Sequence, residues 1–317
     1  MRFSVIIPLY NKALYVEKAL RSVMNQTFKD FELVVVNDGS KDDSLAVAQK
    51  VLEGFPAVIV DQKNAGVSTA RNNGVAASHG NHICFLDADD WWEPTFLDEM
   101  SRLIDEFADA GIYGTNYTIV NEMKHKTRVA PIGVEEGFEK GYINYCQVYA
   151  KKLAMPLWTG AVCIPRRVFG EFDGFKSHLK LGEDFDLWIR VALKYKVVFL
   201  NKPLSNYNQD VEIANRGTSR LHNPENHMLW NLGYLEEEEK TNSDYKQLID
   251  NLRVYSLMPY FLSQQYHDAA RQELDKVDWS KQPDKAYKQY TKPLWLLRIG
   301  QRLRRCGSQL KRRIKRK

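Results

Sequence analysis

Four apolar runs, separated by helix-like segments over about the first hundred residues, constrain the fold of this chain more than any other feature. The runs are Phe3–Pro8, Phe31–Val36, Ala57–Val60 and His82–Leu86, and the helix-like segments are Leu14–Asn25, Asp42–Leu52, Val67–Ala77 and Thr95–Phe107. Strands that alternate with helices of about 10–15 residues are typical of βαβ units, which build a parallel sheet covered by helices. We therefore predict an α/β fold with a mostly parallel sheet flanked by helices.

Each of these predicted strands ends in polar residues. The four strand ends read Pro8-Leu9-Tyr10-Asn11, Asn37-Asp38-Gly39-Ser40, Asp61-Gln62-Lys63-Asn64 and Asp87-Ala88-Asp89-Asp90. Open α/β sheets bind ligands at the carboxyl ends of their strands. Turn chemistry alone explains any one of these ends, because Asp-Gly-Ser is a good turn sequence. It explains all four together poorly, so we predict that they face one ligand-binding crevice.

The last strand end carries three carboxylates directly after the apolar run Ile83–Leu86. Buried strands avoid charge, because an ionised carboxylate is costly to remove from water without a partner. Mg²⁺ or Mn²⁺ typically takes one or two protein carboxylates and completes its shell with phosphate oxygens and water. Asp87 and Asp89 point to the same side of an extended chain. The alternative is an acidic helix cap, but the context favours a divalent cation.

Other features exclude several classes of protein. No Gly-x-Gly-x-x-Gly follows the first strand and no P-loop sequence occurs, so neither a dinucleotide fingerprint nor a P-loop is supported. No apolar stretch approaches 18 residues, and the N-terminus enters a strand without a signal-peptide pattern. The four cysteines are scattered, which fits buried, reduced thiols. We therefore expect a cytoplasmic protein.

Several motifs, in this order along the chain, are similar to those of glycosyltransferase family 2. They are Val5-Ile6-Ile7-Pro8-Leu9-Tyr10-Asn11, Val35-Val36-Asn37-Asp38-Gly39-Ser40, Asn64-Ala65-Gly66 with Ala70-Arg71-Asn72, Asp87-Ala88-Asp89, and Glu183-Asp184. The resemblance covers about residues 1–220. It implies the GT-A fold, a Rossmann-like, mostly parallel sheet flanked by helices. It also implies inverting transfer from a nucleotide sugar.

With 317 residues, the chain is long enough for one large α/β domain and an appendage. We expect a GT-A domain over residues 1–225, a helical extension over 226–290 and a basic amphipathic tail over 291–317. In the less periodic middle we predict strands at Ala110–Val120, Lys124–Pro131, Gly160–Pro165 and Val197–Leu200, a helix from Gly182, and a polar loop over Asn206–Pro224. Glu236–Glu239 is predicted to be a solvated acidic run.

The resemblance also implies roles for residues on the nucleotide side of the site. Pro8 and Tyr10 would pack against the base, usually uracil. Asp38 would hydrogen-bond the base, and Arg71 would lie near the base or the diphosphate. Asp87 would contact the ribose.

The same resemblance assigns the chemistry to two further carboxylates. Asp89 would ligate Mn²⁺ or Mg²⁺ bridging the two phosphates, which stabilises the leaving diphosphate. Asp184 would be the general base that deprotonates the acceptor hydroxyl. The alternative for Glu183 and Asp184 is a favourable pair of charges at a helix N-terminus. Asp186 would face elsewhere and is predicted to be structural.

Further candidates for the acceptor, donor-sugar or loop region are Trp158, Thr159, Glu183 and His222. The alternatives are an idle loop histidine at His222 and packing roles for aromatic residues; Trp92 and Trp188 are predicted to be core residues. Many family members carry Gly-Gly-Phe-Asp-Glu where this chain has Asp173-Gly174-Phe175-Lys176-Ser177, which leaves the acceptor loop open. The Gln-x-x-Arg-Trp motif of processive synthases is absent, which favours transfer of a single sugar.

The C-terminal segment is strongly basic. Residues 285–317 hold 13 Lys and Arg and no Asp or Glu, which leaves 32 basic and 40 acidic residues in the remainder. Trp and Leu on one side with cations around them are typical of an interfacial helix that binds anionic lipids. The alternatives are a solvated disordered tail and nucleic-acid binding, although an acidic body would repel a polyanion. We predict peripheral attachment to the inner face of the cytoplasmic membrane and no nucleic-acid partner.

Together these features predict a metal-dependent hexosyltransferase. It would move one sugar, from a UDP-sugar, to a hydroxyl of a surface-glycan precursor such as lipopolysaccharide, capsule or another lipid-linked saccharide. Two alternatives stay open. A nucleotidyltransferase that makes nucleotide sugars would want a Gly-rich basic loop after the first strand, which this chain lacks. A non-catalytic membrane-bound scaffold would have little reason to keep several unpaired carboxylates, because they are a burden on stability.

Overall fold

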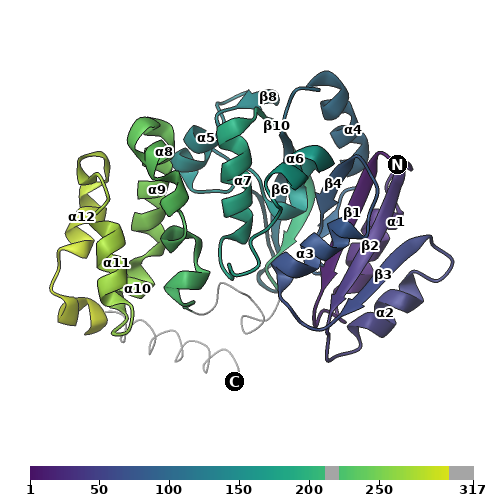
Figure 1. Cartoon of the computed structure of the whole chain (residues 1–317), viewed down its shortest axis with the longest axis horizontal. Helices are drawn as coiled ribbons and strands as arrows, with labels where there is room; N and C mark the ends of the chain where they lie inside the picture. Colours follow the sequence, from purple (N-terminus) through teal and green to yellow (C-terminus); the bar gives the residue numbers. More distant parts are fainter. Residues whose placement is uncertain (211–220, 300–317) are drawn as a thin grey trace. The chain divides into compact units, whose positions relative to one another are not determined.

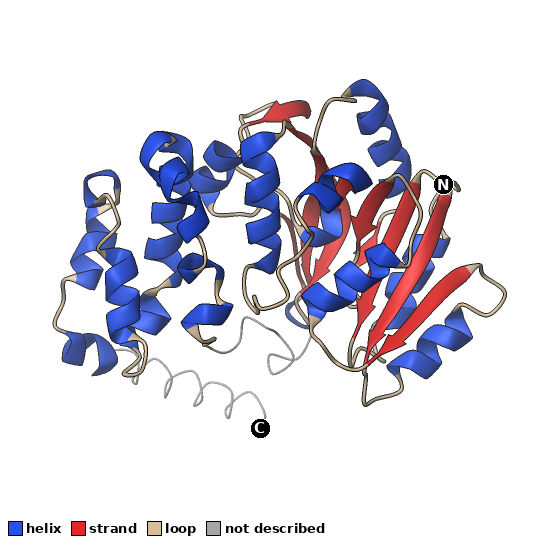
Figure 2. Ribbon diagram, in the orientation of Figure 1, coloured by secondary structure: helices blue, strands red, loops and turns tan. Residues whose placement is uncertain are grey.

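A computed structural model describes residues 1–210 and 221–299 of the chain (Figures 1 and 2). The chain forms two compact units, which divide between Gly233 and Tyr234. The first unit contains the sheet and the second is helical. The domain boundaries predicted above stay predictions.

In the described residues, the first unit is built on a ten-stranded sheet with the order β3-β2-β1-β4-β9-β6-β10-β5, in which β7 pairs with β6 and β8 with β10. The strands are β1 (Phe3–Leu9), β2 (Phe31–Asp38), β3 (Ala57–Gln62), β4 (His82–Phe85), β5 (Trp91–Trp92), β6 (Ile112–Asn121), β7 (Lys126–Val129), β8 (Lys140–Ile143), β9 (Val162–Pro165) and β10 (Val197–Asn208). β3, β2, β1 and β4 are parallel, whereas β9 runs antiparallel to both β4 and β6. The predicted α/β fold is therefore confirmed, with a mixed sheet.

Helices cover both faces of this sheet (Figure 2). They are α1 (Val16–Met24), α2 (Ser44–Val51), α3 (Val67–Ala76), α4 (Phe96–Glu106), α5 (Tyr145–Lys152), α6 (Arg166–Glu171) and α7 (Glu183–Lys194). Strands buried on both faces are continuous apolar runs. Accordingly, Val5 and Ile7 of β1 pack in one core with α1 and α4. Phe85 of β4, on the other face, contacts aromatic rings of α6 and α7.

Gly74 sets the close approach of α3 to the sheet. A Cβ at this position would lie 2.3 Å from Cγ2 of Ile6 in β1. Ile6 is completely buried, so a larger residue would push α3 away from the strand. This contact fixes the helix that carries Arg71, and therefore one side of the site described below.

The middle of the chain differs from the prediction in several elements. β10 does not end at Leu200 but continues to Asn208, so the first residues of the predicted polar loop are strand. Its pairing with β6 shifts register on either side of Pro203. Such an irregularity accommodates a proline that cannot donate to the ladder. The elements α5, α6, β5 and β8 were not predicted, because short segments have too little periodicity to be recognised.

The core predictions for individual side chains are confirmed. Trp92 and Trp188 are 3% and 0% exposed. Cys84, Cys146 and Cys163 are buried free thiols, while Cys306 lies outside the described residues. No described helix is both long enough and apolar enough to span a membrane.

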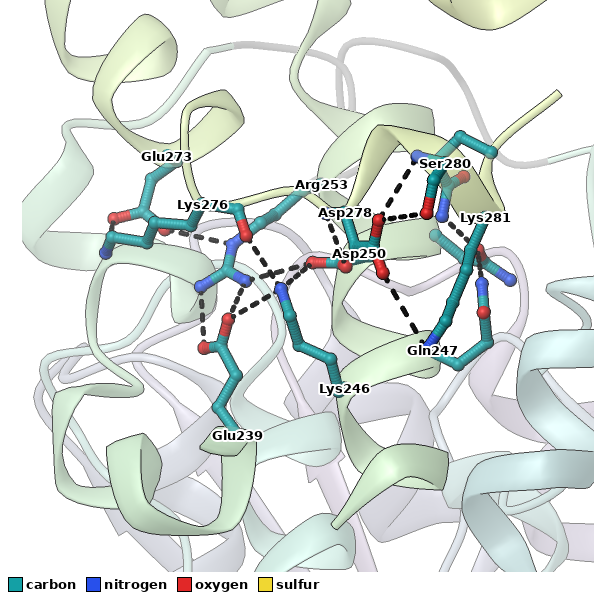
Figure 3. Close-up of polar contacts among 12 residues, drawn as sticks. Glu239, Lys246, Gln247, Asp250, Arg253, Glu273, Lys276, Asp278, Ser280 and Lys281 are labelled. Atoms are coloured by element: carbon teal, nitrogen blue, oxygen red, sulfur yellow. Dashed lines mark hydrogen bonds and ion pairs between the residues drawn. The ribbon is translucent and has the colours of Figure 1, made fainter. Parts of the chain in front are cut away.

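The second unit contains α8 (Glu236–Thr241), α9 (Ser243–Ser256), α10 (Met258–Leu262), α11 (His267–Leu274) and α12 (Asp284–Tyr290). An ion-pair cluster lies among α8, α9 and α11 (Figure 3). The guanidinium of Arg253 contacts Glu239 (2.5 Å), Glu273 (3.1 Å) and Asp250 (3.4 Å). Lys246 adds a contact of 2.7 Å to Asp250. Glu239 is therefore not part of a solvated run as predicted, because Arg253 holds it in this cluster.

The predicted basic tail is described only at its beginning. Residues 294–299 are helical, and Trp295, Leu296 and Ile299 are 65%, 45% and 46% exposed. The remainder of the predicted tail, residues 300–317, lies outside the described residues. Residues 211–220, which are most of the predicted polar loop, also lie outside the described residues.

Candidate active site

Asp38, at the end of β2, fixes the turn that leads into α3. Its carboxylate accepts hydrogen bonds from the backbone N–H groups of Ala65 (2.8 Å) and Gly66 (2.9 Å) and from the amide of Gln62 (2.8 Å). Gly66 has φ +93, a conformation that glycine adopts without strain. Asp38 is 3% exposed, so its first role is to shape this loop. The predicted contact with the nucleotide base stays a prediction.

The end of β1 presents an exposed aromatic ring beside this loop. Tyr10 is 40% exposed, and Pro8, two residues earlier, is half-buried. Asn11 follows with φ +52. Its N–H donates to Oγ of Ser40 (3.1 Å), and its side-chain oxygen accepts from the N–H of Lys41 (2.8 Å). The two strand ends are thus tied together, and the ring of Tyr10 is free to pack against a planar ligand.

Arg71, in α3, brings two distant carboxylates together. Its guanidinium donates to Asp87 (2.8 Å) and Glu183 (3.1 Å) and lies over the ring of Phe175 at 5.2 Å. Burial acts to lower the pKa of Arg71, but the two carboxylates outweigh it and raise that pKa. Arg71 is therefore a permanent cation between the end of β4 and the start of α7.

The three aspartates after β4 lie in different surroundings. The side chains of Asp87 and Asp89 are 29% and 18% exposed, whereas Asp90 is 2% exposed and accepts the N–H of Asn208 (2.8 Å). Asp89 is paired with Lys12 (2.6 Å). Burial, together with the charge of Asp87, raises the pKa of Asp89 against the opposing effect of Lys12. Asp87 and Asp89 are therefore partly open to solvent, although each is paired with a cation, while Asp90 holds β10.

Burial raises the pKa of Asp90 well above its usual value, and the charges of Asp89 and Asp87 add to this effect. The three aspartates thus form a locally crowded set of acids. A cation that binds Asp87 or Asp89 would relieve this repulsion.

Glu183 and Asp184 occupy the first turn of α7, after Gly182. Asp184 accepts the N–H of Phe185 (2.7 Å) and the hydroxyl of Thr159 (3.2 Å). Burial, reinforced by Asp184, raises the pKa of Glu183 to about 7. Burial also raises the pKa of Asp184, and Arg71 opposes this shift. Both acids therefore hold protons more tightly than exposed carboxyls do, which suits a group that exchanges a proton near neutral pH.

Trp158 belongs to an aromatic cluster beside this acid pair. Its ring stacks on Tyr117 of β6 at 5.5 Å and contacts Tyr207 of β10 at 4.4 Å between centroids. Thr159, the next residue, is the hydrogen-bond donor to Asp184. The structure therefore brings Trp158 and Thr159, both predicted as site residues, to the side of the site where Asp184 lies.

His222 is 7% exposed and lies near His227. Burial, together with the charge of His222, lowers the pKa of His227 to about 4. Over residues 1–210 and 221–299, no group of three or more His, Cys, Asp or Glu is arranged to hold a metal ion alone. A metal at Asp89 would therefore need ligands from a bound substrate or water. The predicted role of His222 stays a prediction.

A hollow of about 660 Å³ adjoins the predicted nucleotide side of the site, lined by Asn37, Gly39, Ser40, Asp42, Asp43, Leu45, Ala46, Gln49, Asp61, Gln62 and Lys63. Residues of the second and third predicted strand ends line it, but none of the side chains predicted to bind nucleotide, metal or acceptor does. Its charged lining is three aspartates and one lysine, which is a poor match for a diphosphate. The region around Arg71, Asp87 and Asp89 is therefore a better candidate than this hollow for the reaction centre.

Sequence reasoning missed three residues that the structure places at the site: Lys12, Tyr117 and Tyr207. Lys12 directly follows the first strand-end motif, so its position in the sequence could have identified it as a site residue. Tyr117 and Tyr207 lie within strands that pair with each other, and no local pattern separates them from core aromatics. Their contact with Trp158 depends on strand pairing across many intervening residues.

The sheet, with an arginine linking strand-end and helix-start carboxylates, defines a protein of the GT-A class. The structure of TarS residues 1–349 from Staphylococcus aureus, in complex with UDP-GlcNAc, has a TM-score of 0.70 at 19% identity, over 90% of this chain and 83% of that one. The mannosyltransferase PcManGT from Pyrobaculum calidifontis, in complex with GDP-Man and Mn²⁺, has a TM-score of 0.50 at 15% identity, over 89% and 88% of the two chains. At these identities the likeness shows the fold.

Residues 4–169 match the profile of Glycosyl transferase family 2. Glycosyltransferase GlyA from Streptococcus pneumoniae is 34% identical over 216 residues, which are 65% of this chain and 30% of GlyA. The chain belongs to glycosyl transferase family 2, which confirms the resemblance found in its motifs. It spans about a third of the length of the first curated relatives that it matches.

Proposed function

We propose that this chain is an inverting glycosyltransferase that moves one sugar from a UDP-sugar to a hydroxyl of a saccharide acceptor. One observation carries the proposal: Arg71 contacts both Asp87 and Glu183, the neighbour of Asp184. Arg71 thereby links Asp87, which is proposed to bind the sugar donor, with the start of α7, which holds the proposed general base Asp184. We take residues 1–225 as the catalytic domain, 226–290 as a helical extension and 291–317 as a basic tail.

In this proposal the nucleotide lies across the strand ends of β1, β2 and β4. Tyr10, 40% exposed, packs against the base together with Pro8, and Asp38 hydrogen-bonds the base. Asp87 bonds the ribose, and Arg71 contributes positive charge near the diphosphate. The TarS structure contains UDP-GlcNAc, which supports uracil as the base.

The accessible carboxylates fit a divalent metal. Asp87 and Asp89 are partly exposed, and they lie beside Asp90 in a crowded set of acids in which the pKa values of Asp89 and Asp90 are raised. Mg²⁺ and Mn²⁺ often take only one or two carboxylates when substrate phosphates supply further oxygens, and the PcManGT complex contains Mn²⁺. Asp89 would hold this ion, which when bound would neutralise charge on the diphosphate.

Asp184 is the proposed general base. The Phe185 N–H and the Thr159 hydroxyl orient its carboxylate, and its raised pKa makes it a stronger base than an exposed aspartate. It would accept the proton of the acceptor hydroxyl while that oxygen attacks the sugar from the face opposite the diphosphate. Attack on that face inverts the anomeric centre. Trp158 would support the acceptor sugar.

We further propose that the acceptor is a lipid-linked precursor of a surface glycan at the inner face of the cytoplasmic membrane. Two observations support this: the 13 basic residues and no acidic ones over 285–317, and the exposed side chains of Trp295, Leu296 and Ile299. Cations and a tryptophan beside apolar residues suit the surface of an anionic bilayer. Equal sedimentation with anionic liposomes of chains with and without residues 290–317 would remove this part of the proposal.

The reaction can be tested without a known acceptor by release of UDP from a panel of UDP-sugars in the presence of Mn²⁺. Wild type should release UDP, and Asp184→Asn should reduce the rate by about 10²–10⁴-fold, because the water or hydroxyl loses its base. Asp186→Asn is the matched control, because Asp186 faces Lys176 and Arg190 rather than the site. It should lower stability but leave the rate of the folded protein near wild type.

Other outcomes would favour the alternatives. Formation of a nucleotide sugar from a nucleoside triphosphate and a sugar phosphate would favour a nucleotidyltransferase. Nucleotide binding without release from any donor, equal in wild type and Asp184→Asn, would favour a scaffold.

A further inference from the structure

Lys12 and Asp89 form an ion pair inside the candidate active site. Nζ of Lys12 lies 2.6 Å from Oδ2 of Asp89, and the two side chains are only 17% and 18% exposed. Salt screens partly buried pairs less than exposed ones. Without a ligand, the ammonium of Lys12 therefore neutralises the carboxylate that is proposed to bind the metal.

The backbone of Lys12 is held firmly, so only its side chain can move. Its N–H donates to Oγ of Ser44 (2.7 Å). Its carbonyl accepts the N–H groups of Tyr15 and Val16, both at 2.9 Å, at the start of α1. Asn11, directly before it, is bonded to the turn after β2. The ammonium is thus carried by a flexible four-carbon side chain on a backbone that these hydrogen bonds hold in place.

Arg71 and Lys12 differ in how easily a ligand can displace their charged groups from the carboxylates. The side chain of Arg71 is 4% exposed, and its guanidinium joins two carboxylates at once. The contact of Lys12 with Asp89 is a single one. An ammonium on a flexible stem reorients more readily than a planar guanidinium fixed at two points. Of these two cations, Lys12 is the one that an incoming ligand can displace.

We propose that Lys12 is an internal counter-cation that keeps a divalent metal off Asp89 until a nucleoside diphosphate offers its ammonium other anionic oxygens. The inference rests on the proposed metal role of Asp89. Nζ and a metal ion repel each other and compete for the same carboxylate. When a diphosphate draws the ammonium away, Asp89 is released for the metal. Nucleotide and metal then strengthen each other's binding by the same factor, as linkage requires.

The test is binding of Mn²⁺ to the full chain, followed by the electron paramagnetic resonance signal of free Mn²⁺, with and without UDP. Wild type should bind Mn²⁺ weakly alone and at least ~10-fold more tightly with UDP, within the usual range of such coupling. Lys12→Met should bind Mn²⁺ alone ~10-fold more tightly than wild type, and UDP should add correspondingly less.

Two further variants serve as controls. Lys12→Arg keeps a cation beside Asp89 and should therefore bind Mn²⁺ as weakly as wild type in the absence of UDP. Lys41→Met removes a positive charge from an exposed lysine in the neighbouring turn and should leave Mn²⁺ binding unchanged. Circular dichroism establishes that each variant is folded.

Equal or weaker Mn²⁺ binding by folded Lys12→Met in the absence of UDP would overturn the inference. If UDP still promoted Mn²⁺ binding in that case, the proposed function would stand without it. No Mn²⁺ binding by any variant, even with UDP, would overturn both the inference and the metal role of Asp89.

Discussion

Arg71 and Glu183 lie 112 positions apart in the sequence and form an ion pair with 3.1 Å between Nη1 and Oε1. Their side chains are 4% and 14% exposed. Arg71 also holds Asp87 at 2.8 Å, so one guanidinium joins α3, the end of β4 and the start of α7. The stability of the first unit and the geometry of the candidate site therefore depend on the same contact.

Above about pH 7, where Glu183 is ionised, Arg71→Met should destabilise the first unit by about 3–5 kcal/mol, because removal of one partner leaves buried charges uncompensated. Urea unfolding measures this change. Arg102→Met is the matched control: Arg102 also pairs with an aspartate, Asp98, at 2.8 Å, but its side chain is 68% exposed. It should change the unfolding free energy by less than about 1 kcal/mol. Similar losses in the two variants would contradict the role of the buried pair.

The titration of Glu183 should make stability fall as pH rises. Burial and the charge of Asp184 raise its pKa from 4.5 to about 7, so the native state keeps a proton that the unfolded chain has already lost. The stability from neutral Glu183 is complete below about pH 4.5 and is lost as pH rises through about 7. Urea unfolding of wild type and Glu183→Gln gives the unfolding free energy at each pH. As pH rises through this range, the free energy of wild type should fall relative to that of Glu183→Gln. Curves that stay parallel would show that the pKa is not raised.

Gly182 positions the acid pair at the start of α7. It has φ +80, and a Cβ at this position would lie 2.3 Å from Cγ of Met228. Gly182→Ala should lower stability by about 1–3 kcal/mol, because the backbone conformation is strained for alanine, and it should also slow UDP release by displacing Asp184.

Gly170→Ala, in α6, is the control for this substitution. A Cβ there meets nothing within 4 Å, and alanine favours a helix over glycine by about 1 kcal/mol. Thermal melting should therefore show a loss for Gly182→Ala and no loss for Gly170→Ala. A neutral Gly182→Ala would contradict the argument from backbone conformation.

Arg253 has the corresponding structural role in the second unit (Figure 3). It is 2% exposed and contacts Asp250 and Glu273, which are 3% and 7% exposed. Arg253→Met should destabilise this unit by about 3–5 kcal/mol. Lys240→Met, whose side chain is 57% exposed and pairs with Glu236, should have an effect below about 1 kcal/mol. Hydrogen exchange of α9 and α11 measures this difference between the two variants. Equal protection in both would contradict a stabilising role for the buried ion pairs of Arg253.

The sequence predicted the parts of the fold that local patterns determine. The first four parallel strands and their helices were recognisable because apolar runs, turns and helix starts recur at short range. The position of Asp87 and Asp89 at the end of β4 was recognisable in the same way, since a carboxylate cluster directly after a buried run is unusual; their contacts with ribose and metal stay predictions. Trp188 was correctly assigned to the core from its place among apolar residues of a helix.

Contacts between distant segments could not be predicted in this way. The pairing of Lys12 with Asp89, and of Arg71 with Glu183, depends on how β1, β4 and α7 come together. The continuation of β10 through Pro203 was missed because proline usually ends a strand, whereas here a register shift accommodates it. Glu239 was predicted to be solvated because its partner, Arg253, lies in another helix.

The most direct test of the proposed nucleotide and metal site is thermal melting with UDP, GDP, CDP and dTDP, each with and without Mn²⁺, on wild type and Asp89→Ala. A ligand at 100 times its dissociation constant stabilises a protein by about 2.7 kcal/mol, which is several degrees for a domain of this size. We expect a shift with UDP that requires Mn²⁺ and disappears in Asp89→Ala. No shift with any nucleotide, in either protein, would contradict the assignment of this site to a nucleotide-sugar donor.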